Sequence, residues 1–166
     1  SLSDTCLYSK SSEEEEDVNI IPLPDGEIVY LGNHVAARYI ANEKPHPKHP
    51  YITDTTAIIR CIDINSIPLA DLPTLKIKID DTLGAPISSY FKQVFDFVDK
   101  HIKGRLFFHC WKGVSRSATM LIAYIMYKYK MSCEDAITYV KKYRPCVDPN
   151  IGFYVQLRKF EKTLNL

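Results

Sequence analysis

One short segment of this chain combines a nucleophile, a glycine and a cation at a spacing that suits phosphate chemistry. The thiol of Cys110 can attack phosphorus, and the planar guanidinium of Arg116 can hold two phosphate oxygens at once. Gly113 lets the intervening loop curl, so that its backbone N–H groups can point inward and bind an anion. The segment reads His109-Cys110-Trp111-Lys112-Gly113-Val114-Ser115-Arg116-Ser117-Ala118.

The flanking sequence predicts the two elements that position this loop. An apolar run at 106–108 precedes it and has the character of a buried strand, whereas residues 118–129 have the pattern of a helix. The N-terminus of that helix adds positive potential, which favours an anion and also stabilises a thiolate. The alternative is that Cys110 is a buried cysteine at a strand end and Arg116 an ordinary residue at a helix start. The longer string His-Cys-x-x-Gly-x-x-Arg-Ser, in its predicted strand-loop-helix context, argues against that alternative.

The loop resembles the phosphate-binding loop of the cysteine-dependent protein phosphatases, specifically the dual-specificity branch and its small atypical members. That branch typically reads His-Cys-x-x-Gly-x-Ser-Arg-Ser, and residues 115–117 match its ending. Related RNA 5′-phosphatases and lipid phosphatases carry other residues in the loop; the lipid enzymes have lysine where Trp111 and Val114 stand here. Further family-like phrases occur at 81–91 and 144–157, so the resemblance covers about residues 27–164.

The resemblance implies a role for each loop residue. Cys110 would be the nucleophile, and the hydroxyl of Ser117 would ease departure of its thiolate. His109 would order the loop through hydrogen bonds rather than act as an acid or base. The phosphate would be held by Arg116 and the loop amides, which belong to Trp111, Lys112, Gly113, Val114, Ser115 and Arg116. No metal ion or other cofactor is expected.

The reaction also needs an acid, because the leaving alkoxide or phenoxide must receive a proton. Asp80 and Asp81 follow a predicted strand, and Gly84 allows the loop at 80–86 to move. Matching the Asp-Thr phrase and the Tyr-Phe pair at 90–91 to the family implies that Asp81 is the acid. One alternative is that Asp80 is the acid. Another is that Asp81 is an ordinary turn aspartate with no catalytic role. After the first step, Asp81 would activate the water that hydrolyses the phosphocysteine.

Composition indicates an ordinary globular domain whose net charge does not point to a strongly charged binding partner. The 166 residues are 46% apolar and 25% charged, and the net charge is +1, which points to neither nucleic acid nor a membrane. The five cysteines have neither zinc-site nor disulfide-framework spacing, which favours a reducing compartment, the cytosol or the nucleus. The longest apolar stretch, 118–127, is too short to span a bilayer. The sequence is compatible with a monomer but does not determine the oligomeric state.

The chain divides into a predicted flexible acidic tail at 1–19 and a catalytic domain at 20–166. The acidic run at 11–17 suits a solvated tail, with a docking or autoinhibitory segment as the alternative. Prolines recur in the stretch 43–50, which excludes a helix or a central strand there. His46 and His49 in this stretch are expected to lie in an exposed linker rather than to bind a metal.

The pattern of apolar residues predicts an α/β fold. Strands are expected at 28–31, 57–62, 75–79 and 106–108, with a short helix at 34–42 and one of about fifteen residues before the loop. Three further helices follow the loop; the second begins at Ser132 and the third near Asn150. This order predicts a three-layer sandwich, whose central mixed, mostly parallel sheet is flanked by helices and carries the phosphate loop between a strand and a helix.

Three side chains near the loop allow two interpretations each. Trp111 can line the rim and stack on a phosphoaryl group, or pack beneath the loop. Lys112 can add positive potential for anionic substrates, or remain a solvated side chain. Cys61 is expected to be a buried structural thiol, with a reversible disulfide to Cys110 as the alternative. Arg60 stands where relatives often carry asparagine, so support for the loop from that side is not expected.

These features together predict a protein phosphatase that acts on phosphotyrosine and on phosphoserine or phosphothreonine in phosphoprotein substrates. The chain lacks the Asn-Arg-Tyr phrase that deepens the pocket of tyrosine-only enzymes, which implies a shallow pocket. One alternative is the same chemistry on a phosphoinositide or an RNA end. Another is a catalytically weak phospho-binding module, although such modules usually lose the cysteine, the arginine or the acid. The sequence does not identify the physiological substrate.

Overall fold

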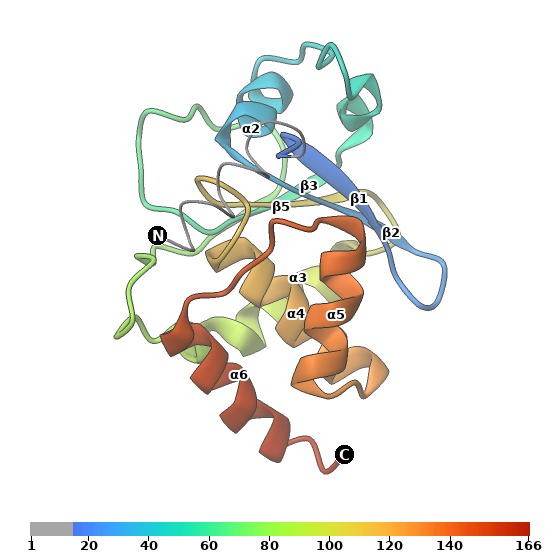
Figure 1. Ribbon diagram of the computed structural model, residues 1–166. Coiled ribbons are helices and arrows are strands. Elements are labelled where there is room, and N and C mark those ends of the chain that lie inside the picture. Colours follow the sequence, from blue (N-terminus) through green and yellow to red (C-terminus); the bar gives the residue numbers. More distant parts are fainter. Residues whose placement is uncertain (1–14) are drawn as a thin grey trace.

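A five-stranded mixed sheet forms the centre of the molecule in the computed structural model, which describes residues 15–166 (Figure 1). The spatial order is β1-β2-β5-β3-β4; β1 pairs antiparallel with β2, and the other pairs are parallel. The strands are β1 (Val18–Pro22), β2 (Ile28–Gly32), β3 (Ala57–Arg60), β4 (Thr74–Lys76) and β5 (Leu106–His109). The mixed, mostly parallel sheet predicted from the sequence is confirmed.

Helices cover both faces of this sheet, which confirms the predicted three-layer sandwich. In Figure 1, α2 lies above the sheet, while α3, α4 and α5 lie below it, with α6 farther out. All four residues of β5 are buried, as expected for a central strand with both faces covered. Phe108 belongs to the core against α3–α6, and Phe107 to the core against α2. The helices are α2 (His34–Ala41), α3 (Phe91–His101), α4 (Arg116–Tyr129), α5 (Cys133–Tyr143) and α6 (Ile151–Lys162).

Local capping explains where most of these helices begin. The side chain of Ser132 accepts from the N–H of Asp135 and caps α5, while Asn150 accepts from the N–H of Phe153 and caps α6. The predicted starts of both helices are therefore confirmed. No side chain caps α4, so the N–H groups of its first turn face the phosphate loop without a competing acceptor from a cap.

The edges of the sheet differ from the sequence-based expectation. β1 was not predicted; it begins at Val18, so residues 18 and 19 belong to the folded domain rather than to a tail ending at 19. The part of the acidic run at 11–14 lies outside the described residues.

The strand expected at 75–79 is shorter in the structure, where β4 spans Thr74–Lys76. This edge strand pairs only with β3, and the chain then leaves the sheet. Ile77 and Ile79 still point into the core. The predicted helix of about fifteen residues is a 3-10 turn, η2 (Ile87–Tyr90), followed by α3.

The prediction of an exposed linker at 43–50 is wrong for its histidines. His46 is only 4% exposed, and its Nε2 lies 2.7 Å from a carboxylate oxygen of Asp17. His49 pairs in the same way with Glu16, at 2.8 Å. The acidic residues next to β1 thus bind the segment that follows α2, a partnership between positions about thirty residues apart that spacing alone does not reveal. Within residues 15–166, no three His, Cys, Asp or Glu side chains gather to hold a metal ion.

No helix between residues 15 and 166 has the length and apolar character needed to cross a membrane.

Substituting Gly32, at the end of β2, is predicted to destabilise the fold. A Cβ there would lie 2.4 Å from the carbonyl oxygen of Asp17 and 3.1 Å from the ring of Phe107. We expect Gly32→Ala to lower the free energy of unfolding by about 1–3 kcal/mol, measured by urea denaturation. Gly84→Ala is the matched control, because a Cβ there meets nothing within 4 Å, and its stability should be unchanged or raised by up to about 1 kcal/mol. Equal stabilities of the two variants would contradict this packing argument.

Candidate active site

The loop at 110–115 lies at the carboxyl edge of the parallel strands. It connects the end of β5 to the start of α4, and the sheet register places His109 between Gly32 of β2 and Arg60 of β3. The chain segments that follow β3 and β4 leave the sheet at the same edge. Ligands of open α/β sheets bind at this edge, so the fold positions the predicted residues where a site is expected.

The carbonyl oxygens on one side of the loop are held by Arg144. Its Nη2 donates to the oxygen of Lys112 and its Nε to the oxygen of Gly113, both at 2.9 Å. The same guanidinium donates through Nη1 to the backbone oxygen of Glu16 at 2.8 Å and to the side chain of Asn19 at 2.7 Å. Arg144 is 1% exposed, and burial lowers its pKa. This buried cation therefore ties the loop to the strand segment that begins the described chain.

Backbone N–H groups and the hydroxyl of Thr119 hold the remaining carbonyl oxygens. The oxygen of Trp111 accepts from the N–H of His34 at 2.9 Å, and that of Val114 from the N–H of Asp148 at 2.8 Å. The oxygen of Ser115 accepts from both the N–H and the hydroxyl of Thr119, at 2.8 and 2.7 Å. Because the N–H and C=O of a trans peptide point in opposite directions, outward carbonyls turn the amides of residues 112–116 inward.

Gly113 is required by this curl. Its φ is +69°, and a Cβ at this position would lie 2.4 Å from the oxygen of Gly32 and 3.0 Å from Nη2 of Arg144. Only glycine tolerates both the backbone conformation and the close approach.

The thiol of Cys110 is buried at the base of the curl, with 2% of the residue exposed. Its Sγ lies 3.3 Å from the N–H of Gly113 and 3.2 Å from the hydroxyl of Ser117, both of which can donate to it. Sequence analysis grouped the same residues, and the structure brings them together.

His109, the residue before Cys110, is also buried. Its Nδ1 lies 3.3 Å from the carbonyl oxygen of Cys110, and its ring stacks on Phe107. Burial lowers the pKa of His109 to about 4, so the imidazole is neutral at pH 7. A neutral ring that donates to the neighbouring carbonyl has the geometry expected of a residue that orders the loop.

Arg116 is the first residue of α4 and follows the phosphate loop directly. Its Nη1 donates to the carbonyl oxygen of Ile79 at 3.1 Å, which fixes the side chain beside the segment leading to the acid loop. Its Nε is buried, with no acceptor in the described part of the chain, and this donor is thus left for a ligand.

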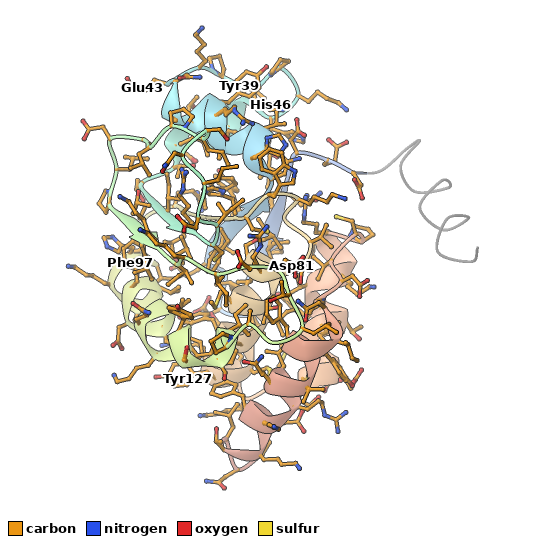
Figure 2. All side chains as sticks on the ribbon, turned by 90° about the vertical axis from the view of Figure 1, so that its left-hand side faces the viewer. Tyr39, Glu43, His46, Asp81, Phe97 and Tyr127 are labelled. Atoms are coloured by element: carbon orange, nitrogen blue, oxygen red, sulfur yellow. The ribbon has the colours of Figure 1, made fainter. Side chains whose placement is uncertain are left out.

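We call residues 80–86 the acid loop, after the role predicted for Asp81, which Figure 2 labels. One carboxylate oxygen of Asp81 accepts from the hydroxyl of Ser115 and from Nδ2 of Asn150, both at 2.8 Å. The N–H of Asn150 in turn donates to the hydroxyl of Ser115 at 3.0 Å, and its Nδ2 also lies 3.2 Å from the oxygen of Thr82. It is Asp81, rather than Asp80, whose carboxylate contacts the phosphate loop.

The side chain of Trp111 packs against neighbouring residues and does not line the rim of the site. Its ring stacks on His34 at 3.7 Å with an interplanar angle of 11°, and it lies against the core beneath α2. Arg38 approaches the same ring at 5.8 Å. Lys112 is exposed, although its backbone oxygen is bound by Arg144.

Cys61 and Arg60 lie on the neighbouring strand. The register that pairs Arg60 with His109 brings Cys61 beside Cys110; burial, and then the nearby Cys110, raise the pKa of the Cys61 thiol. Both cysteines are free thiols, and their pairing under oxidation stays a prediction. Arg60 is buried and donates to the carbonyl oxygens of Ile67 at 2.9 Å and Pro68 at 3.4 Å, so it supports the segment after β3 and not the phosphate loop.

Sequence analysis missed the roles of Arg144 and Asn150. Both belong to the family-like phrase at 144–157, which was the only available signal. Asn150 was predicted as a helix start, but its amide also holds Asp81.

Comparison with known proteins identifies the family. The family model described as "Dual specificity phosphatase, catalytic domain" matches residues 29–163. The chain belongs to this family, as the sequence resemblance predicted.

Two relatives and one solved structure illustrate the similarity. The chain is 41% identical over 96 residues to "Putative tyrosine phosphatase 123R" of Invertebrate iridescent virus 6, a match that covers 57% of this chain and 68% of the relative. It is 41% identical over 87 residues to human "Dual specificity protein phosphatase 1", covering 51% of this chain but only 24% of that protein. The structure of the human tyrosine phosphatase-like serine/threonine/tyrosine-interacting protein aligns with a TM-score of 0.69 and 29% identity, over 89% of this chain and 98% of that one.

Arg144→Met is predicted to destabilise the protein strongly, because it leaves the buried carbonyl oxygen of Gly113 and the partly buried ones of Lys112 and Glu16 without their donor. Each acceptor left unpaired costs about 1–3 kcal/mol, so the free energy of unfolding should fall by at least about 3 kcal/mol in urea denaturation. The control is Arg158→Met, whose side chain is 50% exposed in its contact with Glu134 and should change stability by less than about 1 kcal/mol. A small effect of Arg144→Met would show that the loop is held by other contacts.

The depressed pKa of His109 predicts a dependence of stability on pH. Between the ordinary pKa of 6.5 and about 4, the unfolded chain binds a proton that the folded protein does not. Stability from this group is therefore complete above pH 6.5 and is lost as pH falls toward 4, by about 3 kcal/mol in all. Urea denaturation from pH 4.5 to 7 should show a smaller slope for His109→Asn than for the parent or for the control His101→Asn. Parallel curves for all three proteins would be inconsistent with a buried neutral imidazole.

Proposed function

We propose that this chain hydrolyses phosphate monoesters of tyrosine, serine and threonine in proteins through a phosphocysteine at Cys110. The observation that carries the proposal is the position of the Cys110 thiol within a curl of inward amides, while the carboxylate of Asp81 is hydrogen-bonded to Ser115 of the same loop. Membership of the dual specificity phosphatase family supports the same reaction.

In the first step, Sγ of Cys110 attacks phosphorus and a sulfur–phosphorus bond forms as the bond to the leaving oxygen breaks. The loop amides and Arg116 bind the equatorial oxygens, whose negative charge they are preorganised to receive. Asp81 donates its proton to the leaving oxygen, which departs as the alcohol or phenol.

In the second step, water attacks the phosphocysteine and transfers a proton to the carboxylate of Asp81. The sulfur–phosphorus bond breaks, inorganic phosphate forms, and the thiolate returns to Cys110. The hydroxyl of Ser117, 3.2 Å from Sγ, stabilises this thiolate as it leaves. Only side chains, backbone amides and water take part in these steps.

Asn150 is the proposed positioning residue for the acid. Its side-chain oxygen caps α6, while its side-chain nitrogen holds the Asp81 carboxylate and the oxygen of Thr82. The first turn of α6 thereby fixes where the proton is delivered.

The substrate range is proposed from the openness of the acid loop. Residues 80–84 are all exposed, which suits a shallow site that both short and long phosphorylated side chains can reach. We assign the partner as a phosphoprotein rather than a nucleic acid or membrane, in line with the net charge of +1. The free thiols of Cys61, Cys110 and Cys133 support action in the cytosol or nucleus.

A phospho-binding module is the second candidate, because the human structural neighbour is described as a phosphatase-like interacting protein. The presence of Cys110, Arg116 and Asp81 in one constellation favours the enzyme.

Activity of single variants tests the proposal with an aryl phosphate across the pH range. We expect Cys110→Ser to lose at least about a thousandfold in kcat. Asp81→Asn should lose about 100- to 10,000-fold and the basic limb of the pH–rate profile, because the protonated acid is no longer supplied. Asp80→Asn is the matched control and should retain the activity and profile of the parent.

Three outcomes would change the assignment. Parent-like behaviour of Asp81→Asn would remove it as the acid. An inert parent under reducing conditions would favour the binding module. A parent that hydrolyses phosphoinositides or RNA 5′ ends far faster than phosphopeptides would change the substrate class.

A further inference from the structure

An exposed apolar patch lies where the acid loop meets α6. Its members are Leu83, 64% exposed, Ile151, 61% exposed, and Val155, 44% exposed. Ile151 and Val155 are four residues apart on α6 and therefore share one face of the helix. The backbone of Leu83 packs on the same helix, since a Cβ on Gly152 would lie only 2.0 Å from the oxygen of Leu83. Solvent-facing apolar clusters of this kind mark interaction sites.

Hydrogen bonds fix this patch relative to the acid. Gln156 donates to the oxygen of Ala85 at 2.9 Å and accepts from the N–H of Ser88 at 3.0 Å. Together with the contacts of Asn150 to Asp81 and Thr82, these bonds join the acid loop to α6 on both sides of Leu83. The patch is thus formed before any substrate binds, and binding need not order it.

Chain geometry places the patch close to Asp81. Consecutive Cα atoms are about 3.8 Å apart, so the Cα of Leu83 lies within about 7.6 Å of that of Asp81. In the proposed reaction, Asp81 contacts the leaving oxygen of the phosphorylated residue. An extended peptide advances about 3.3 Å per residue, so the patch is within reach of side chains one to three positions from that residue.

We propose that the patch of Leu83, Ile151 and Val155 is a substrate subsite that binds a large apolar side chain one to three residues from the phosphorylated residue. The inference rests on the proposed function, and it adds a sequence preference to it. The occupant is the substrate polypeptide itself, because the patch is part of the loop that carries the acid. Apolar area removed from water, rather than charge, provides the selectivity.

A scan of phosphotyrosine peptides tests the subsite. A single leucine is moved from three positions before to three positions after the phosphotyrosine in an otherwise serine- and alanine-based peptide, and kcat/KM is measured for each. We expect kcat/KM of the parent to be about 5- to 10-fold higher for the peptide with leucine at one particular position than for the peptide with serine at that position. Leu83→Ser and Val155→Ser should each reduce that ratio to below about 2-fold. The ratio of two peptides is independent of any change in intrinsic turnover.

Leu69→Ser is the matched control, since Leu69 is a similarly exposed leucine, at 51%, outside the acid loop and α6. It should keep the preference of the parent. A parent that turns over an aryl phosphate but shows no leucine preference overturns the subsite and leaves the proposed function standing, as does a preference that survives both patch variants. A parent inert toward the aryl phosphate and every peptide overturns the proposed function and the subsite together.

Discussion

The outward orientation of the carbonyl oxygens at 111–115 is the constraint on which the rest of this site depends. Each of them accepts a hydrogen bond from a group outside the curl. Because the N–H and C=O of a trans peptide point in opposite directions, the N–H groups of the loop point inward. This loop conformation requires a glycine at 113, a second glycine at 32 against which the first one packs, and a buried arginine at 144. A loop built in this way turns a set of N–H donors toward one point, and this is the arrangement that we propose for binding the phosphate.

The acid comes from a separate segment, and α6 connects it to the loop. Asn150 links three elements, because it caps the helix, holds Asp81 and donates through its backbone to Ser115. Asp81 and the phosphate loop are thereby held by a shared network, although they come from segments about thirty residues apart. The same attachment leaves Leu83 exposed beside the acid, which is how the fold comes to offer an apolar surface next to a charged pocket.

Local features of the chain were predictable, and long-range partnerships were not. The strand-loop-helix unit around Cys110 and the caps at Ser132 and Asn150 depend on residues within a few positions of each other. Arg144 binds Gly113, 31 residues away, and Glu16, 128 residues away, so no periodicity indicates that it is buried. The burial of His46 was missed for the same reason, since its partner Asp17 precedes it by 29 residues. β1 escaped prediction because a short edge strand carries little pattern of its own.

The most direct test of this account is a crystal structure with tungstate, a tetrahedral oxyanion that mimics phosphate. We predict that its oxygens accept hydrogen bonds from the amides of residues 112–116 and from the guanidinium of Arg116, with Sγ of Cys110 facing the metal centre of the oxyanion. The loop carbonyls should keep the partners they have without the anion. An oxyanion bound elsewhere, or loop amides that turn away from it, would contradict the central claim that the outward carbonyls prepare the site.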